Sequence, residues 1–559
     1  MKKKLKSIVV VSICMVIFMA GSVVYGAKDN TIDQTRRLDA LSKVWGLLKY
    51  YHPEVAKGEI DWDAALITAI PAVKAALDYD SFNQEINNLI VQAGDVTIED
   101  YNPHTPAHPN EALFKWIKDS SLFNKDVRKK LMLVQKKHVP TENHYIQKYS
   151  SGNINPEIEE PYLYPLFPDE NYRLLGLFRY WNIIQYFYPN KDDIEKEWKQ
   201  LQLEFIPRLI DAANPIEYGL TVKELTTRIK DSHGPAEGGY IDYYFGLYYV
   251  PFTLSFIENQ TVVTHVYSSL LDSPDDVRVG DIIIRTHDQD INEFRQSVRK
   301  YAYGSNEAFI ERNINNFVLR GNTNRLSFTL LRDGQTIDII IPAYHMNSSV
   351  FAEVIAEEES QMTKWKILPG NIGYVHMGIL EQTDVAAAMA ELSNTRAIIF
   401  DIRNYPNGTL YLISHYLNSQ PEEYAKVMIP EIDYPGDFYF TPIILTGDNN
   451  PDYYRGKVIL LLNEMTLSQA EHTCMVLETA PDVTKIGSQT AGAVGNYSKL
   501  YFPGAISTNF TGLGYYYPDG TPTQRIGIVP DIEVHPTVQG IQDGRDEVLE
   551  FAIQFIENN

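Results

Sequence analysis

The stretch KVILLLNEMTLSQAE, residues 457–471, joins an unbroken apolar run to a segment rich in helix formers. The run at 457–462 has the composition of a strand that is buried on both faces, and the following residues favour a helix. Ser468 lies at the junction. A serine at this position can cap the helix or act as a nucleophile, because the first N–H groups of a helix and its dipole stabilise negative charge. The rest of the sequence has to decide between these two roles.

Strand-like and helix-like segments alternate along the whole second half of the chain. The runs IGYVHMGIL, AIIFDIRNYPNG and VTKIGSQTAGAVGN flank this stretch, and a glycine-rich segment ending in GIVPDIEV closes the series. Such alternation predicts a layered α/β core. In sheets of this kind the active site lies in loops that follow the strands, which is where Ser468 stands.

The charge and the N-terminus limit the function classes. The 559 residues carry a net charge of −23, which argues against binding to nucleic acid phosphates or to an anionic membrane surface. Residues 1–26 combine the basic start MKKKLK with a short apolar run and small residues, and so predict a signal peptide. We expect an exported protein that is periplasmic, extracellular or at the cell surface, with an uncleaved N-terminal anchor as the alternative. No later segment is apolar enough to span a membrane.

The first half of the chain contains an internal repeat. WGLLKYYHP at 45–53 matches WNIIQYFYP at 181–189 without a gap, and the same offset of 136 residues places Asp95 on Asp231. This register predicts a duplicated helical unit. The copies differ at this aspartate, because the second copy reads DSHG and the first reads DVTI. Only the second copy therefore has a serine and a histidine that could take part in catalysis.

Residues 244–345 contain several short β-type runs, and GDIIIRTHDQDINEF at 280–294 resembles the strand, turn and helix start of a PDZ domain. That resemblance implies peptide binding by strand addition, and a packing or gating module is the alternative. We therefore predict a multidomain α+β protein with the following divisions: signal peptide 1–26, first helical copy 33–165, second helical copy 172–240, PDZ-like domain 244–345 and catalytic core 346–559.

Four motifs of the second half occur in an order that carries a family resemblance. FDIRNYPNG, LNEMTLSQAE, IGSQTAGAVG and the closing PDG with GIVPDIEV follow one another, and DSHG precedes them. Together, from about residue 172 to 557, they resemble the C-terminal-processing-peptidase family of serine proteases, peptidase family S41, in its tricorn-like branch. The resemblance implies a core related to ClpP and crotonase, a peptide or protein substrate, and Ser468 as nucleophile. The backbone N–H groups of Gln469 and Gly408 would stabilise the oxyanion.

The same resemblance directs the search for a general base. Many members of the family use a lysine, which the alignment places at Ala493, and a methyl group accepts no proton. Lys499 lies six residues on and fits the motif poorly. The tricorn-like branch uses a histidine that follows a serine ahead of the PDZ-like module, which here is His233 after Ser232. An unperturbed histidine titrates near 6.5 and can serve as a base at neutral pH, with Ser232 assisting by hydrogen bonding.

A base also needs an orienting partner, and the acidic residue of the family falls on Gln524. An amide oxygen can accept the imidazole N–H, although it stabilises an imidazolium less than a carboxylate does. Asp519 and Asp531 are nearby alternatives, and both also suit a purely structural role. The chain has no HExxH motif and no cysteine cluster, so we expect no metal or other cofactor.

Two functions follow. The first is an exported serine endopeptidase that works through an acyl-enzyme on Ser468 with His233 as base. The second is a catalytically inactive S41-like protein that binds a peptide, a polymer or an apolar ligand, because Ala493 and Gln524 replace two polar groups that the family leads one to expect.

Overall fold

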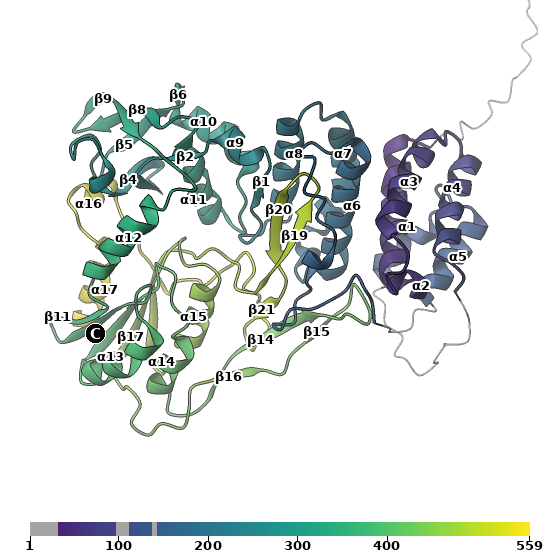
Figure 1. Ribbon diagram of the computed structural model, residues 1–559. Helices are drawn as coiled ribbons and strands as arrows, with labels where there is room; N and C mark the ends of the chain where they lie inside the picture. Colours follow the sequence, from purple (N-terminus) through teal and green to yellow (C-terminus); the bar gives the residue numbers. More distant parts are fainter. Residues whose placement is uncertain (1–31, 97–110, 137–141, 559) are drawn as a thin grey trace, which may run out of the picture.

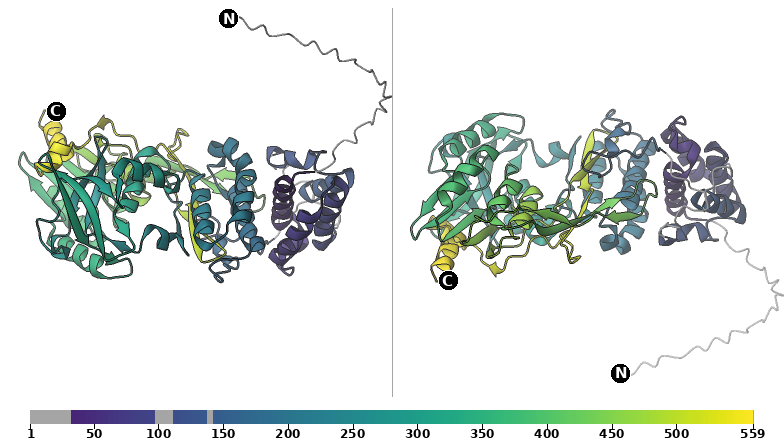
Figure 2. Two further views of the ribbon diagram at one scale, coloured as in Figure 1. Left: turned by 90° about the horizontal axis from the view of Figure 1, so that it is seen from above. Right: turned by 90° about the horizontal axis from the view of Figure 1, so that it is seen from below.

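The computed structural model describes residues 32–96, 111–136 and 142–558. The predicted signal peptide lies outside these residues. The molecule is elongated, with the first helices at one end and the C-terminal sheet at the other (Figures 1 and 2). Its separate helical and sheet-containing parts confirm the predicted multidomain α+β fold. In the described ranges, none of the helices has the length and hydropathy that crossing a membrane requires.

Two sets of three helices repeat the offset that the sequence shows. Helix α1 (Gln34–Tyr51) and helix α6 (Glu170–Phe187) begin and end 136 residues apart, and each is capped by an aspartate side chain at the preceding position. The remaining helices of the two sets are α3 (Trp62–Ala75), α4 (Tyr79–Gln92), α7 (Glu195–Asp211) and α8 (Pro215–Thr227). In the first set a short α2 (Pro53–Ala56) follows α1, and η2 (Glu111–Lys118) and α5 (Lys125–Lys136) complete the group.

Equivalent side chains make equivalent contacts in the two sets. The indole of Trp45 donates to the Trp62 carbonyl at 2.8 Å, and that of Trp181 donates to the Trp198 carbonyl at 3.4 Å. Arginines near the start of α1 and α6 likewise bond two carbonyl groups near the end of the neighbouring helix, from Arg37 in the first copy and Arg173 in the second. The repeated tryptophans are all buried and therefore belong to the packing between the helices.

The two copies pack against each other through matching positions. A Cβ added at Gly46 would lie 1.8 Å from Oδ1 of Asn182, which occupies the equivalent position of the second copy. The Asn182 amide donates to carbonyl groups in both copies, at Ser42 and Phe178. Nearby, Glu159 pairs both with buried Lys49 of the first copy at 2.6 Å and with Arg179 of the second copy at 3.0 Å. The copies are thus joined by close backbone approach and by ion pairing.

An antiparallel sheet in the order β3-β4-β5-β8-β9 forms the middle module. Its strands are β3 (Phe252–Ile257), β4 (Gln260–Val266), β5 (Ile282–Thr286), β8 (Arg325–Arg332) and β9 (Gln335–Pro342), with helices α10 (Ile291–Val298) and α11 (Glu307–Val318). Edge strand β3 contacts α11, since the Asn315 amide donates to the Leu254 carbonyl at 3.1 Å. This contact favours the packing alternative for the module, and its assignment as PDZ-like stays a prediction.

The C-terminal sheet has the order β11-β12-β13-β17-β18-β22 and is parallel except for edge strand β11 (Trp365–Leu368). The parallel strands are β12 (Ile372–His376), β13 (Ala397–Asp401), β17 (Lys457–Leu462), β18 (Val483–Gly487) and β22 (Ile532–Glu533). Central β17 buries Leu460 against one core and Leu461 against another. Helices α13 (Val385–Leu392), α14 (Leu410–Leu417) and α15 (Gln469–Leu477) cover the first face, and α17 (Glu547–Asn558) covers the second.

Late strands of the chain return to the helical part. Strand β20 (Ile506–Thr511) pairs with β1 (Ala236–Gly238) on one side and with β19 (Tyr497–Phe502) on the other, and β19 contacts α6 (Figure 1). The segment 346–559 is therefore continuous in sequence but not in space. This return brings the loop after α8, which carries DSHG, toward the C-terminal sheet.

A further sheet reaches even farther along the molecule. It contains β14 (Glu422–Pro430), β15 (Phe438–Phe440), β16 (Ile444–Thr446) and β21 (Gly514–Tyr516), and Figure 1 shows it running below the central strands toward the helices. At its tip, the Pro435 carbonyl accepts from the Tyr51 hydroxyl at 2.5 Å, and the Gly436 carbonyl accepts from Lys191 at 3.2 Å. The C-terminal part thus contacts both helical copies.

Candidate active site

Ser468 stands at the turn between β17 and α15 with φ 58° and ψ −115°. A side chain at positive φ is strained, by about 1–3 kcal/mol for sparsely populated regions, and such strain persists only where the surrounding structure enforces it. Here the Thr466 hydroxyl donates to the Ile402 carbonyl at 2.8 Å and fixes the turn to the neighbouring strand end. A serine on a strained strand-to-helix turn is the arrangement that exposes a nucleophile above a sheet.

Glu471, three residues after Ser468, holds this turn to the glycine loop that follows β18. Its buried carboxylate accepts from the N–H groups of Gly492 at 2.7 Å, Ala493 at 2.9 Å and Ser468 at 3.3 Å, and from the Thr490 hydroxyl. Burial raises the pKa of Glu471, and these hydrogen bonds oppose the rise. The carboxylate therefore serves as a structural bridge between the serine turn and the loop.

The structure provides no lysine base at the positions that the sequence singles out. Ala493 is fully buried, and its N–H bonds Glu471. Lys499 lines the same cleft as Ser468, but its ammonium group lies 5.0 Å from the ring centre of Tyr501. A hydrogen bond to Tyr501 raises the pKa of Lys499, which keeps the side chain protonated at neutral pH.

His233 lies in the tight turn after α8 and is largely buried. Its Nδ1 is 2.9 Å from the Thr511 hydroxyl, and its backbone N–H donates to Asp231 at 2.9 Å. Among the described residues Nε2 has no hydrogen-bond partner. Burial lowers the pKa of His233, and the nearby charge of Asp231 opposes this. The imidazole is thus neutral at neutral pH, as a general base has to be.

Ser232 connects the base turn to the middle module and to the glycine loop. It exchanges hydrogen bonds with Ser305, backbone N–H to hydroxyl in both directions at 2.8 Å, and its hydroxyl donates to the Ala491 carbonyl at 2.7 Å. The Gln524 amide donates to the Ser305 hydroxyl at 3.3 Å. The Ser232 hydroxyl therefore holds three loops together.

The structure corrects the predicted contact between Gln524 and His233. Thr511 occupies Nδ1, and the described hydrogen bond of the Gln524 side chain goes to Ser305 instead. The two alternatives have local structural contacts, since Asp519 accepts the N–H of Thr521 and Asp531 accepts that of Lys485, each at 2.8 Å. The sequence reasoning missed Thr511, because nothing in its neighbourhood distinguishes it, and missed Asp231, although this residue begins the DSHG motif.

Ser468 opens on a cleft of about 850 Å³. Gly408, at φ 70°, and Gln469 line it too, and a Cβ at Gly408 would lie 3.3 Å from Nε2 of the Gln469 side chain. The two predicted oxyanion donors are therefore neighbours of Ser468. His233 does not line the cleft and shares no described hydrogen bond with Ser468, but Tyr497 lines the cleft and its ring centre lies 5.9 Å from that of His233.

A cluster of aromatic rings borders the cleft one helical turn beyond Ser468. His472 stacks on Tyr424, and its Nε2 is 3.1 Å from the Tyr424 hydroxyl. Burial lowers the pKa of His472 to about 4, so this side chain is neutral over the physiological range. Its contacts are those of a packing residue, in agreement with its place in the helix.

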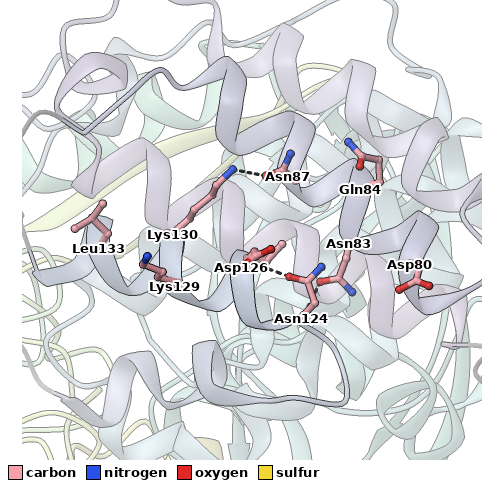
Figure 3. Close-up of a pocket in the computed structure, with 10 residues that line it drawn as sticks. Asp80, Asn83, Gln84, Asn87, Asn124, Asp126, Lys129, Lys130 and Leu133 are labelled. Carbon is pink, nitrogen blue, oxygen red and sulfur yellow. Dashed lines mark hydrogen bonds between the residues drawn. The ribbon is translucent and has the colours of Figure 1, made fainter.

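A groove between α4 and α5 offers a second large concavity of about 570 Å³ (Figure 3). Its amide groups hold the helices together, because Asn83 donates to the carbonyl groups of Tyr79 and Leu122 and Lys130 bonds Asn87. Its lining contains no serine, cysteine or histidine. Elsewhere in the described ranges no cluster of His, Cys, Asp and Glu has the make-up of a metal site. The Ser468 cleft is therefore the candidate active site.

Comparison with known families agrees with this choice. A model described as Peptidase family S41 matches residues 371–534, which contain Ser468, Gln469, Glu471 and Gly408. This region belongs to peptidase family S41. The S41 assignment supports a peptidase function with a peptide or protein as substrate. His233, Asp231 and Ser232 lie outside the matched region, so their roles depend on the structure.

Solved structures of CPAF are similar to this chain in fold over 70% of its length. Mature CPAF in complex with lactacystin is 16% identical over 70% of this chain and 99% of that chain, with a TM-score of 0.53. A protein from Parabacteroides merdae is 15% identical over 70% of this chain and 97% of that chain, with a TM-score of 0.43. The photosystem II D1 C-terminal processing protease is 14% identical over 67% and 98%, with a TM-score of 0.38. Among curated protein sequences, none matches the chain.

Proposed function

We propose that the protein is an exported serine endopeptidase whose nucleophile is Ser468 and whose general base is His233. The observation that carries the proposal is the geometry of Ser468, which is held at positive φ at the start of α15 and opens on a large cleft within the S41 region. Glu471 accepts the Ser468 N–H as in a capping box, so this contact alone also suits a helix cap, but a serine that only capped its helix would not need the strained turn.

The proposed reaction follows from the groups around this serine. The Ser468 hydroxyl attacks a peptide carbonyl while Nε2 of His233 takes its proton and then returns it to the leaving amine. The N–H of Gln469, one of the first in α15, and that of Gly408 stabilise the oxyanion. Loss of one such donor typically costs about 10²–10³ in rate. Water then hydrolyses the acyl-enzyme by the reverse sequence of proton transfers.

Substrate binding has to bring the base and the nucleophile together. Tyr497 lines the Ser468 cleft and lies beside the His233 ring, and Nε2 of His233 has no hydrogen-bond partner among the described residues. Hydrogen bonds at active sites are often long in the unliganded state and shorten in the complex.

A fluorophosphonate probe tests the nucleophile and the base separately. We expect the wild-type protein to be labelled, Ser468→Ala to remain unlabelled, and His233→Gln to be labelled at least about 10³ times more slowly, as for other serine–histidine pairs. Labelling that persists in Ser468→Ala would overturn the nucleophile assignment. Peptide mapping of the labelled protein identifies the modified residue, and a cleavage profile on mixed peptides with Ser468→Ala as control defines the substrate.

Export is part of the proposal and has its own test. Expression of the full chain in a bacterium, followed by N-terminal sequencing of the exported protein, should give a start at Ala27. A protein that stays membrane-associated and retains Met1 would favour the uncleaved anchor instead.

A binding protein on the same scaffold is the second candidate. It is favoured by the missing hydrogen bond between Ser468 and His233 and by the buried methyl group of Ala493 where a base could stand. This candidate predicts that wild type and Ser468→Ala bind peptides equally and that neither reacts with the probe. Labelling of the wild type decides for the peptidase.

A further inference from the structure

Thr511 connects the base turn to β20, the middle strand of the three-stranded sheet β1-β20-β19. Its hydroxyl lies 2.9 Å from Nδ1 of His233 and donates to Oδ1 of Asp231 at 2.7 Å, while its backbone N–H donates to Oδ2 at 2.6 Å. Asp231 and Thr511 are both about 1% exposed. The carboxylate therefore has no access to bulk water and interacts with a fixed set of donors.

The directions of these hydrogen bonds determine the tautomer of His233. A carboxylate only accepts, so the hydroxyl proton of Thr511 points to Asp231. The oxygen of Thr511 then has only lone pairs to offer to the imidazole, and Nδ1 has to carry the proton. Nε2 is consequently the unprotonated nitrogen, and it is also the one that has no partner among the described residues.

We infer that Thr511 and Asp231 form a positioning relay that fixes His233 in the tautomer with a basic Nε2 and stabilises the imidazolium through one intervening hydroxyl. This inference rests on the proposed function, because it concerns the base of that site. Neither residue touches the substrate, so both act through His233. No bond is formed or broken in the relay, and the proton of Nδ1 remains on the imidazole throughout.

The relay explains how a base can operate with Gln524 in place of an acid. In Ser-His-Asp sites a buried carboxylate holds the Nδ1 proton directly, and loss of its charge lowers the rate about 10⁴-fold. Here the carboxylate comes from the turn that carries His233, and a threonine from a distant strand spans the gap. The Gln524 amide is left to join the loops at Ser305.

Two substitutions at one position distinguish the relay from simple packing. Thr511→Val keeps the shape of the side chain and removes the hydroxyl, whereas Thr511→Ser keeps the hydroxyl and removes the methyl group. We expect fluorophosphonate labelling to slow about 10–100-fold in Thr511→Val, less than the direct-carboxylate loss, and to return to within about threefold of wild type in Thr511→Ser. Thr508→Val, a buried threonine of the same strand whose hydroxyl contacts only a local carbonyl at 3.5 Å, is the matched control and should leave the rate unchanged.

A spectroscopic measurement reports the tautomer without reference to activity. With ¹⁵N-labelled histidine, the ring signals assigned by comparison with His233→Gln should show a protonated Nδ1 and an unprotonated Nε2 at neutral pH in the wild type. In Thr511→Val the two nitrogens should move toward an averaged pair of signals, because neither tautomer is then favoured.

The outcomes distinguish failure of the relay from failure of the proposed function. If the wild type is labelled and Thr511→Val is labelled at the same rate with the same ring signals, the relay is wrong and the peptidase proposal stands. If Thr511→Ser stays as slow as Thr511→Val, Thr511 acts by packing, and the relay is again wrong. If the wild type is not labelled at all, the peptidase proposal fails, and the ring signals alone still decide whether Thr511 fixes the tautomer.

Discussion

The two helical copies share their backbone plan and differ at their ends. Each has an aspartate cap, a tryptophan pair and an arginine that bonds the neighbouring helix. At the end of the third helix, however, Asp95 of the first copy is exposed, whereas its equivalent Asp231 is buried beneath Thr511. The two copies thus share the same helical scaffold, and only the second has a buried polar site. That site depends on the few residues that follow the third helix and on the strand that carries Thr511.

The largest expected effect of this difference is on the rate. His233→Gln in the second copy should lower probe labelling by about 10³-fold or more, since it removes the base. His52→Gln replaces a buried histidine of the first copy and should leave the rate per folded molecule unchanged. Rates are compared after the folded fraction has been measured by thermal unfolding. Equal losses in the two variants would contradict the assignment of the base to the second copy alone.

Stability should respond alike in the two copies. Trp62→Ala and Trp198→Ala each remove a buried indole and should lower the free energy of unfolding by about 3–5 kcal/mol. Urea titration measures this loss. Labelling should fall further in Trp198→Ala, because α7 supports the unit that carries His233. A large stability loss in only one variant would show that the copies are not equivalent as scaffolds.

Substitution of the two equivalent aspartates should change the labelling rate less than loss of His233 does, and only in the second copy. Asp231→Asn removes the charge behind Thr511 and should slow labelling by about 10²-fold, whereas Asp95→Asn changes an exposed residue and should have no effect on the rate. Labelling kinetics of the two variants at one pH test this. If Asp231→Asn is labelled at the wild-type rate, the charge of the Asp231 carboxylate does not contribute to the reaction.

The contact between the copies should make a moderate contribution to the free energy of unfolding. Gly46→Ala places a methyl group on the Asn182 amide and should lower the free energy of unfolding by about 1–3 kcal/mol. Combining it with Asn182→Ala, which frees the space, should recover part of the loss. A neutral Gly46→Ala would mean that the two copies can move apart at this point.

The smallest expected effect concerns pH. Burial lowers the pKa of both His52 and His233, so both are neutral in the folded protein at pH values where they are half protonated when unfolded. The unfolded state then binds more protons, and stability falls as the pH drops through about 6.5 and levels off below the folded pKa values. His52→Tyr introduces the residue found at the equivalent position 188. It should lower by about one the number of protons taken up on unfolding, and so weaken the pH dependence of the free energy of unfolding. Unfolding midpoints at pH 7.5 and 5.5 measure the change.

The scaffold was predictable because its signals are local or repeated. The 136-residue offset is a repeat, whereas the KVILLL strand and the SQAE motif depend on residues close in sequence, and the helices and strand lie where these patterns indicate. The orienting contact of His233 was not predictable, because it joins residues 278 positions apart and the threonine has no distinctive neighbours. Gln524 was a reasonable interpretation from motif order, but order does not determine which side chain reaches Nδ1.

The pairing of β20 with β1 also determines at which stage of synthesis and folding the site around His233 can form. Asp231 and Thr511 are 280 residues apart, so a ribosome has completed both helical copies, the middle module and nearly all of the sheet before the strand that steadies His233 emerges. An unfolded chain in transit across a membrane likewise has no such pairing. A peptidase assembled in this order would lack the Asp231–Thr511 relay during synthesis and export, and would gain its full rate only once the late strands have folded.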